Sequence, residues 1–261
     1  MTLPDLAAVG LDYSLDGPVA TITLNRPDVR NAQTPAMWRA LAALGRQIPD
    51  DVRVVVVTGH GDTFSAGLDR AMLDPATQGQ ESVIGLLSLS DDEMSAAIDE
   101  FQQGFTFLRD PRFVSVASVR GYAIGAGFQL ALACDLRVVA EDTQFSMKES
   151  ALGLVPDLTG TKPLVESVGY ARALEICATA RMVGAREAVD IGLANLAVPV
   201  EDLDATVADL AAALAAPMAD VVSEIKKLLH GAADRDLDDQ RRLEREAQVR
   251  RFRALATAFA G

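Results

Sequence analysis

Hydrophobic and polar positions divide the chain into two parts, and the first part alternates strands with helices. Residues 19–24 alternate apolar and polar side chains behind an Asp-Gly-Pro turn, so residues 9–24 predict a β-hairpin. Residues 54–57 are four consecutive valines, which is typical of a strand buried on both faces. Further strands are predicted at residues 114–119 and 136–140. This alternation predicts an α/β core.

Helix signals begin early and dominate the last third of the chain. Thr34 followed by Pro35 predicts a capped helix start, and Ser90 with Glu93 has the pattern of a capping box. Residues 74–82 are polar, and we expect a mobile loop there. Later helices are expected at residues 161–168, 170–179, 185–191, 202–214, 218–229 and 238–259, with a short strand at 197–200.

The boundary between the two parts is placed at residue 198. Residues 1–198 then predict the α/β core, and residues 199–261 predict a helical part that mediates oligomerisation. The last helix carries apolar side chains far from the core in sequence, so we expect it to pack on a neighbouring subunit. Its arginines are expected on a solvated face, in salt bridges with Glu244 and Glu246.

The stretch with the most chemical content runs from residue 119 to residue 160. A glycine-rich turn at residues 121–127 leads into a helical run of small and apolar residues. Glycine lets the backbone approach a ligand closely, and the first N–H groups of a helix have no intrahelical acceptor. Those N–H groups favour a negatively charged oxygen. Because Glu149 follows as a proton carrier, the stretch indicates chemistry through an enolate.

Composition narrows the class of protein. The 261 residues include 37 acidic and 24 basic ones, a net charge of −13, which argues against nucleic acid and membrane surfaces as partners. No apolar run has the length of a membrane span, and the N-terminus lacks the pattern of a secretory signal. We expect Cys134 and Cys177 to be reduced, buried and structural, in a cytoplasmic protein. The two histidines have no metal-ligand spacing, so no metal is expected.

Two other classes of site were weighed against this interpretation. A nucleotide-binding α/β protein would explain the glycine-rich turn, but Gln129-Leu130 follows where the dinucleotide fingerprint needs its third glycine. Ser65 lacks both a histidine partner nearby and the nucleophile-elbow pattern, which argues against a serine hydrolase.

Four ordered blocks of residues carry a family resemblance. They are Leu24-Asn25-Arg26-Pro27 with Asn31-Ala32, then Phe64-Ser65-Ala66-Gly67-Leu68-Asp69, then residues 121–127 with Ala133-Cys134-Asp135-Leu136, and finally residues 145–149, 153–156 and 160–161. With this spacing the chain resembles the crotonase family, the enoyl-CoA hydratase/isomerase superfamily, over nearly its whole length.

The resemblance implies a crotonase-like fold, an α/β fold in which repeated ββα turns form two nearly perpendicular sheets with a helical C-terminal part. It implies homotrimers or dimers of trimers, and an acyl-CoA or enoyl-CoA thioester as ligand, with no cofactor besides the coenzyme A of the substrate. The thioester oxygen would accept from the backbone N–H groups of Leu68 and Ala126. The CoA is expected along Val29, Arg30, Ala66, Leu68, Asp69, Arg70 and Ala71, with adenine near the first two and pantetheine along residues 68–71.

The expected catalytic pattern departs from that of the family's hydratases. Those enzymes use two glutamates, of which Glu149 matches the second, while Gln129 stands at the position of the first. An amide positions water but takes no proton at neutral pH. Asp157 stands where hydratases usually have glycine, as in relatives that shift double bonds. Ala126 replaces a commoner glycine and still offers its N–H.

Three functions follow from these departures, with isomerisation favoured over hydration. Glu149 alone shuttles a proton in an enoyl-CoA isomerase, or Glu149 and Asp157 act together in a dienoyl isomerase or an unusual hydratase. The third possible function is a protein that binds acyl-CoA and catalyses no reaction. Structural roles stay open beside these: Glu149 could pair with Lys148 or Arg181, Asp157 could serve a turn, and Gln129 could be a hydrogen-bonded helix residue.

Overall fold

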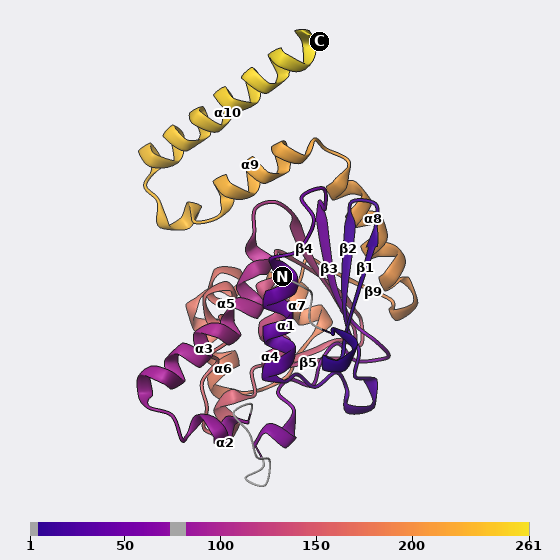
Figure 1. Cartoon of the computed structure of the whole chain (residues 1–261), viewed down its shortest axis with the longest axis vertical. Helices are drawn as coiled ribbons and strands as arrows, with labels where there is room; N and C mark the ends of the chain where they lie inside the picture. The colour runs from indigo at the N-terminus through magenta and orange to yellow at the C-terminus, as the bar shows by residue number, and fades with distance from the viewer. Residues whose placement is uncertain (1–4, 74–81, 261) are drawn as a thin grey trace.

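The computed structural model describes residues 5–73 and 82–260, and Figure 1 shows the path of the chain. The polar segment predicted as a mobile loop lies outside the described residues except for Ser82. Among the described residues, no single helix is both long and apolar enough to span a membrane.

A six-stranded sheet forms the centre of the molecule, in the order β1-β2-β3-β4-β6-β9. β1 and β2 are the predicted hairpin and pair antiparallel, whereas every later pairing in this sheet is parallel. The valines of β3 are buried on both faces, as their sequence predicts. The strand bounds are β1 Leu11–Asp16, β2 Val19–Leu24, β3 Val54–Gly59, β4 Val114–Val119, β6 Leu136–Ala140 and β9 Leu196–Val198.

A second, three-stranded sheet was not predicted from the residue pattern. It has the order β5-β7-β8, with β5 Tyr122–Ile124, β7 Gln144–Ser146 and β8 Val183–Gly184. Strands of two or three residues are too short to show a period, and β5 lies inside the stretch interpreted as a glycine-rich turn. This sheet sets the position of the turn that follows β5.

Helices cover both faces of the main sheet, and the two helix starts predicted from sequence are confirmed. The Oγ1 of Thr34 accepts from the N–H of Met37, and Ser90 with Glu93 forms a reciprocal capping box. The helices are α1 Pro35–Gly45, α2 Val83–Leu86, α3 Asp91–Thr106, α4 Ala126–Ala133, α5 Thr161–Val168, α6 Tyr170–Thr179, α7 Ala185–Asp190, α8 Leu203–Ala215, α9 Ala219–Leu229 and α10 Leu237–Ala260.

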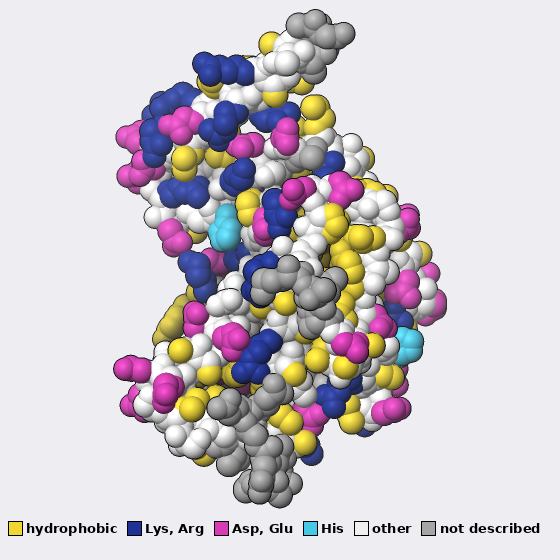
Figure 2. All heavy atoms as spheres, in the orientation of Figure 1, with side chains coloured by type: hydrophobic (Ala, Val, Ile, Leu, Met, Phe, Trp, Pro, Cys, Tyr) yellow, Lys and Arg dark blue, Asp and Glu magenta, His cyan; other side chains and the backbone are white. Residues whose placement is uncertain are grey.

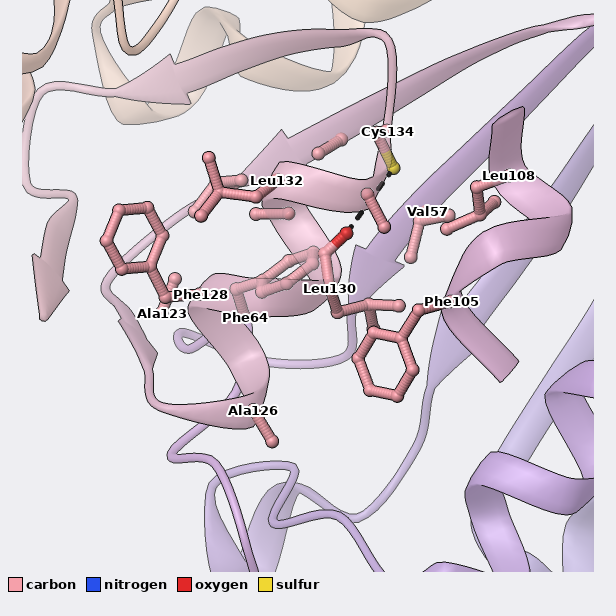
Figure 3. Packing of buried hydrophobic residues seen from close by; sticks show 14 of the residues in the cluster. Val57, Phe64, Phe105, Leu108, Ala123, Ala126, Phe128, Leu130, Leu132 and Cys134 are labelled. Carbon is pink, nitrogen blue, oxygen red and sulfur yellow. Dashed lines mark hydrogen bonds between the residues drawn. The ribbon is translucent and has the colours of Figure 1, made fainter. Parts of the chain in front are cut away.

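The hydrophobic core is divided by the main sheet. On one face, α1, α3 and α4 pack over the sheet, and Figure 3 shows part of this cluster around Phe105, Phe128 and Leu130. On the other face, α8 buries Leu203 and Val207 against the valines of β3 and β4. Because α4 is buried along its whole length, its N-terminus is held firmly in place.

The cysteines differ in burial. Cys134 ends α4 in the core, where burial raises the pKa of its thiol to about 12, so it is unreactive. Cys177, on the outer helix α6, is half-buried rather than buried, which corrects the prediction. Both are free thiols.

The last two helices form an arm, residues 219–260, that extends away from the sheet (Figure 1). Its anchor is Lys226, whose Nζ donates to Oδ2 of Asp135 at 2.7 Å and to the carbonyl oxygens of Asp110 and Phe113, each at 2.8 Å. One ammonium group thus donates to acceptors in both the loop before β4 and the segment after α4, and so links these segments to the arm.

Basic side chains gather over α10 in Figure 2, and most of them are paired. Arg242 bridges Asp239 and Glu246, as the sequence predicts for Glu246, but Glu244 accepts from Gln240 rather than from an arginine. Arg250 and Arg251 reach acids of α9 instead, because α10 lies against α9. The pairs of Arg242, whose partners are all exposed, contribute little stability.

Candidate active site

A cavity of about 990 Å³ brings together residues that are far apart in the sequence. Leu68, Ala126, Gln129, Glu149 and Asp157 all line it. Its other walls are mostly apolar and come from α1, α2, α3 and the loop that follows β7. Every predicted catalytic side chain and both predicted backbone donors therefore share one space.

Two turns meet at the floor of this cavity. Ser65 forms a parallel bridge with Ala123, so the segment before Leu68 lies beside β5. Gly67 has a φ of +88°, and a Cβ atom there would lie 2.5 Å from the carbonyl oxygen of Ile124 and 3.5 Å from the amide nitrogen of Ala126. Only glycine fits such an approach of two backbones. The contact brings the Leu68 turn against the first residue of α4.

Two backbone N–H groups at this contact have no acceptor among the described residues. One belongs to Leu68. In the bridge with Gln33, the carbonyl of Gly67 accepts and the N–H of Asp69 donates, which leaves the N–H of Leu68 unused. The other belongs to Ala126, which begins α4 and so has no partner within that helix. Both residues line the cavity, where their N–H groups and the positive end of α4 suit an anionic oxygen.

Glu149 begins a short 3-10 helix, η5 (Glu149–Leu152), and is half-buried in the cavity wall. Its Oε1 accepts from Nε2 of Gln129 at 2.7 Å, and its Oε2 is buried with no hydrogen-bond partner among the described residues. Burial raises the pKa of this carboxyl, and the charge of Asp157 adds to that rise, while its own backbone N–H and the bond from Gln129 oppose it.

No ion pair competes for Glu149 among the described residues. Lys148 donates to the carbonyl oxygen of Ala180 at 2.6 Å, and Arg181 binds Glu175 and Glu187 on the outer surface. The two cations named as alternative partners are therefore engaged elsewhere. A buried carboxyl with one free oxygen is a common arrangement for a general base.

Gln129 connects Glu149 to the loop after η5. Its side chain is buried on α4, and its Oε1 accepts from the N–H of Leu158 at 2.8 Å and of Gly160 at 3.2 Å. Two donors on the amide oxygen leave only the NH₂ group to face Glu149. The orientation of this glutamine is thus set by the backbone, and it presents a donor to the acid.

Asp157 lies on the open side of the cavity, within the electrostatic reach of Glu149. The cavity walls remove part of its hydration, which raises the pKa of its carboxyl, and its own backbone N–H partly opposes that shift. Gln102 of α3 donates to its carbonyl oxygen at 2.7 Å, which ties this loop to α3.

The residues expected along the CoA are brought only partly into the cavity. Arg30, Ala66, Leu68 and Arg70 line it, whereas Val29, Asp69 and Ala71 do not. Asp69 forms an ion pair with Arg26 at 2.8 Å and caps η3 (Arg70–Leu73) by accepting from the N–H of Ala71. Asp69 thus acts as a helix cap, a common role for aspartate.

Sequence reasoning missed most of the apolar wall of the cavity. The wall includes side chains of α1 and α3 that also belong to the core, such as Trp38 and Phe101. Their spacing predicts burial but does not distinguish core from cavity lining. Met182, just before β8, also lines the cavity and had no signal in the sequence. Among the described residues, no cluster of histidine, cysteine or acidic side chains could hold a metal.

The two sheets, the helical arm and this cavity place two main-chain amides, unpaired within the described part of the chain, beside a half-buried acid, an arrangement that suits an anionic oxygen. The sequence pattern of the Enoyl-CoA hydratase/isomerase family matches residues 15–257. The chain belongs to the enoyl-CoA hydratase/isomerase family, and the predicted crotonase-like fold is confirmed.

Individual relatives agree with this assignment. The fold is similar, with a TM-score of 0.93 and 48% identity over 98% of each chain, to that of a candidate enoyl-CoA hydratase from Thermobifida fusca YX in complex with CoA. A probable enoyl-CoA hydratase of Rhodobacter capsulatus is 33% identical over 90% of this chain and 87% of its own length. The peroxisomal Delta(3,5)-Delta(2,4)-dienoyl-CoA isomerase of Arabidopsis thaliana is 33% identical over 69% of this chain and 65% of its own length.

Proposed function

We propose that this protein binds an enoyl-CoA thioester and moves a double bond within its acyl group by proton transfer beside the thioester carbonyl. The observation that carries this proposal is the half-buried acid Glu149, whose buried Oε2 has no partner among the described residues and shares a cavity with the N–H groups of Leu68 and Ala126. Hydration by the family's two-glutamate pattern needs a second carboxylate, and Gln129 supplies an amide instead.

The amide pair stabilises the enolate that forms when the α-carbon next to the thioester loses a proton. In this role the N–H groups of Leu68 and Ala126 donate to the thioester oxygen, whose negative charge grows in the transition state. Preorganised donors of this kind contribute about 3 kcal/mol each. The close backbone contact at Gly67 supports the role, because it fixes the two donors relative to one another.

Glu149 acts as the base through its free Oε2. The oxygen takes a proton from the substrate, and the neutral acid returns it to a carbon further along the chain. The raised pKa of Glu149 suits such a shuttle, because both protonation states are then easier to reach near neutral pH. Asp157 assists as a second acid on the open side of the cavity, as in dienoyl isomerisation, and Gln129 is a positioning residue that holds Oε1.

Coenzyme A as part of the ligand is supported by relatives. The Thermobifida fusca structures contain CoA and acetoacetyl-CoA. In this chain, Arg30 and Arg70 are among the residues that line the cavity, and their guanidinium groups would suit the phosphate groups of the ligand.

The decisive experiment offers the protein 2-enoyl-CoA and 3-enoyl-CoA separately and follows the absorbance of the conjugated thioester. Isomerisation predicts that absorbance rises with the 3-enoyl substrate and that the 2-enoyl substrate loses little to hydration. Rapid loss of absorbance with the 2-enoyl substrate would instead assign a hydratase. Tight binding with no change in either would assign a silent acyl-CoA-binding protein.

Gln129→Glu should shift the pH dependence of turnover. The new carboxyl would lie hydrogen-bonded to Glu149, and two such groups do not both ionise readily. A base must lose its proton before it acts, so the acid limb of kcat/KM should move to higher pH and turnover at neutral pH should fall. Gln103→Glu on the exposed face of α3 adds the same charge and is the control. An unmoved acid limb would remove Gln129 from contact with the base.

Association of several copies through the α9–α10 arm belongs to the same proposal. Apolar side chains on the arm face solvent, including Ile225, Leu229 and Phe252, and the last of these is 62% exposed. Exposed apolar groups on a helix that extends from the body are typical of an interface.

Phe252→Glu should therefore lower the oligomeric state, because burying a carboxylate in an apolar contact is costly. Sedimentation velocity measures the change, with Gln248→Glu on the same helix as the control, since Gln248 is also exposed. A monomeric wild-type protein would refute the interface outright.

A further inference from the structure

One wall of the cavity is apolar over a length that a short acyl group does not fill. Met94, Ile98 and Phe101 follow one another along a single face of α3, and all three line the cavity. The next residue, Gln102, donates to the carbonyl oxygen of Asp157, so this face begins beside the acids. Met94 and Phe101 are seven positions apart, over which the helix rises about 10 Å. The apolar face extends that far from Asp157.

Exposed apolar side chains add to this wall on the side that faces solvent. Leu87 follows α2, and Leu152, Leu154 and Val155 lie in η5 and the loop behind it. All four line the cavity, yet they are 43–74% exposed. Large apolar side chains clustered at a cavity rim mark a surface that an apolar ligand covers. Together with the three residues of the α3 face, these four side chains form an apolar channel of seven lining residues.

The charged lining residues lie outside this channel. Glu149 and Asp157 lie near the start of the α3 face, Lys148 is next to Glu149, and Arg30 and Arg70 belong to the segments around the Leu68 turn. The cavity therefore has a basic side that suits phosphates and an apolar side that suits hydrocarbon. A polar or charged acyl group would lose hydration in the channel without gaining partners.

Building on the proposed function, we infer that the acyl group of the substrate is an aliphatic chain of medium to long length. An extended chain advances about 3.5 Å for every three single bonds, so the face of α3 accommodates about eight or nine bonds. Ile98 lies halfway along that face and determines the chain-length preference, while Val155 covers the chain at the rim.

Calorimetry with saturated thioesters tests this without any turnover, using CoA, butyryl-CoA, octanoyl-CoA, dodecanoyl-CoA and benzoyl-CoA. Each methylene that enters the channel should tighten binding by up to about fourfold. Dodecanoyl-CoA should then bind more than tenfold more tightly than butyryl-CoA and more tightly than benzoyl-CoA. Equal affinity across the series, or a preference for benzoyl-CoA, would overturn the inference while leaving proton transfer intact. Failure of every thioester to bind better than CoA would remove the proposed function as well.

Two variants place the effect in the channel. Ile98→Asn should lower the affinity for dodecanoyl-CoA at least fivefold and change that for butyryl-CoA less than twofold. Ala96→Asn makes a similar change on the exposed side of α3 and should leave the series unaltered. Val155→Asn repeats the test at a residue that is 74% exposed, where folding is not at risk. Loss of both ligands in equal measure would indicate general damage and contradict the assigned role.

Discussion

Glu149→Gln is expected to reduce turnover by two to four orders of magnitude, the usual contribution of a general acid–base group. The amide has nearly the same shape, and its oxygen can still accept from Nε2 of Gln129, so thioester binding should change little. The loss should appear in kcat rather than KM. Thermal stability should not fall, because burial disfavours the charged form that the substitution removes.

Steady-state kinetics and a thermal melt measure both parts of this prediction. Glu141→Gln, an exposed acid on the surface, is the matched control and should behave like the wild type. Turnover retained in the Glu149 variant would show that another group carries the proton, and Asp157 would be the first to examine.

Gly67→Ala is expected to lower kcat by two to three orders of magnitude. Its methyl group would lie 2.5 Å from the carbonyl oxygen of Ile124, and no side chain could relieve the clash, since both neighbours are backbone. The Leu68 turn must then move away from α4, which separates the two donors and removes one from the oxyanion. Retained kcat would contradict the role of the Leu68 N–H.

Gly17→Ala separates this effect from ordinary backbone strain. Gly17 also has a positive φ, of +53°, but a Cβ atom there meets nothing within 4 Å. Placing alanine in this left-handed conformation costs roughly 1 kcal/mol of stability, which a thermal melt detects, and leaves kcat unchanged. Any loss of kcat in Gly67→Ala beyond that in Gly17→Ala can then be assigned to the contact between the Leu68 turn and the turn before α4.

Periodicity and capping patterns predicted the elements of the main sheet and most helices, because those segments bury one continuous face. Ser90 and Thr34 are local signals, whose partners lie three residues away. The second sheet escaped prediction for the opposite reason, since β7 pairs with strands far from it in sequence and none exceeds three residues. Only the family resemblance implied a second sheet.

In the candidate site, too, the residue types could be predicted from sequence but the contacts between distant residues could not. Sequence identified Gln129 as a departure from a known pattern, but not what it would touch. Its side-chain oxygen accepts from the backbone N–H groups of Leu158 and Gly160, about 30 residues downstream. These two bonds turn its NH₂ group toward Glu149. A buried oxygen without a partner, as in Glu149, is likewise a property of packing and cannot be read from residue types.

Helix α4 is a rod of eight residues, about 12 Å long, with a different task at each end. Its first residue, Ala126, lines the cavity, and Asp135, just past its last turn, binds the ammonium of Lys226 from the arm. A displacement of the arm would thus be transmitted to the cavity through one buried helix. Under the proposed association through the arm, loss of the neighbouring subunits would loosen Lys226 and, through α4, the amide of Ala126.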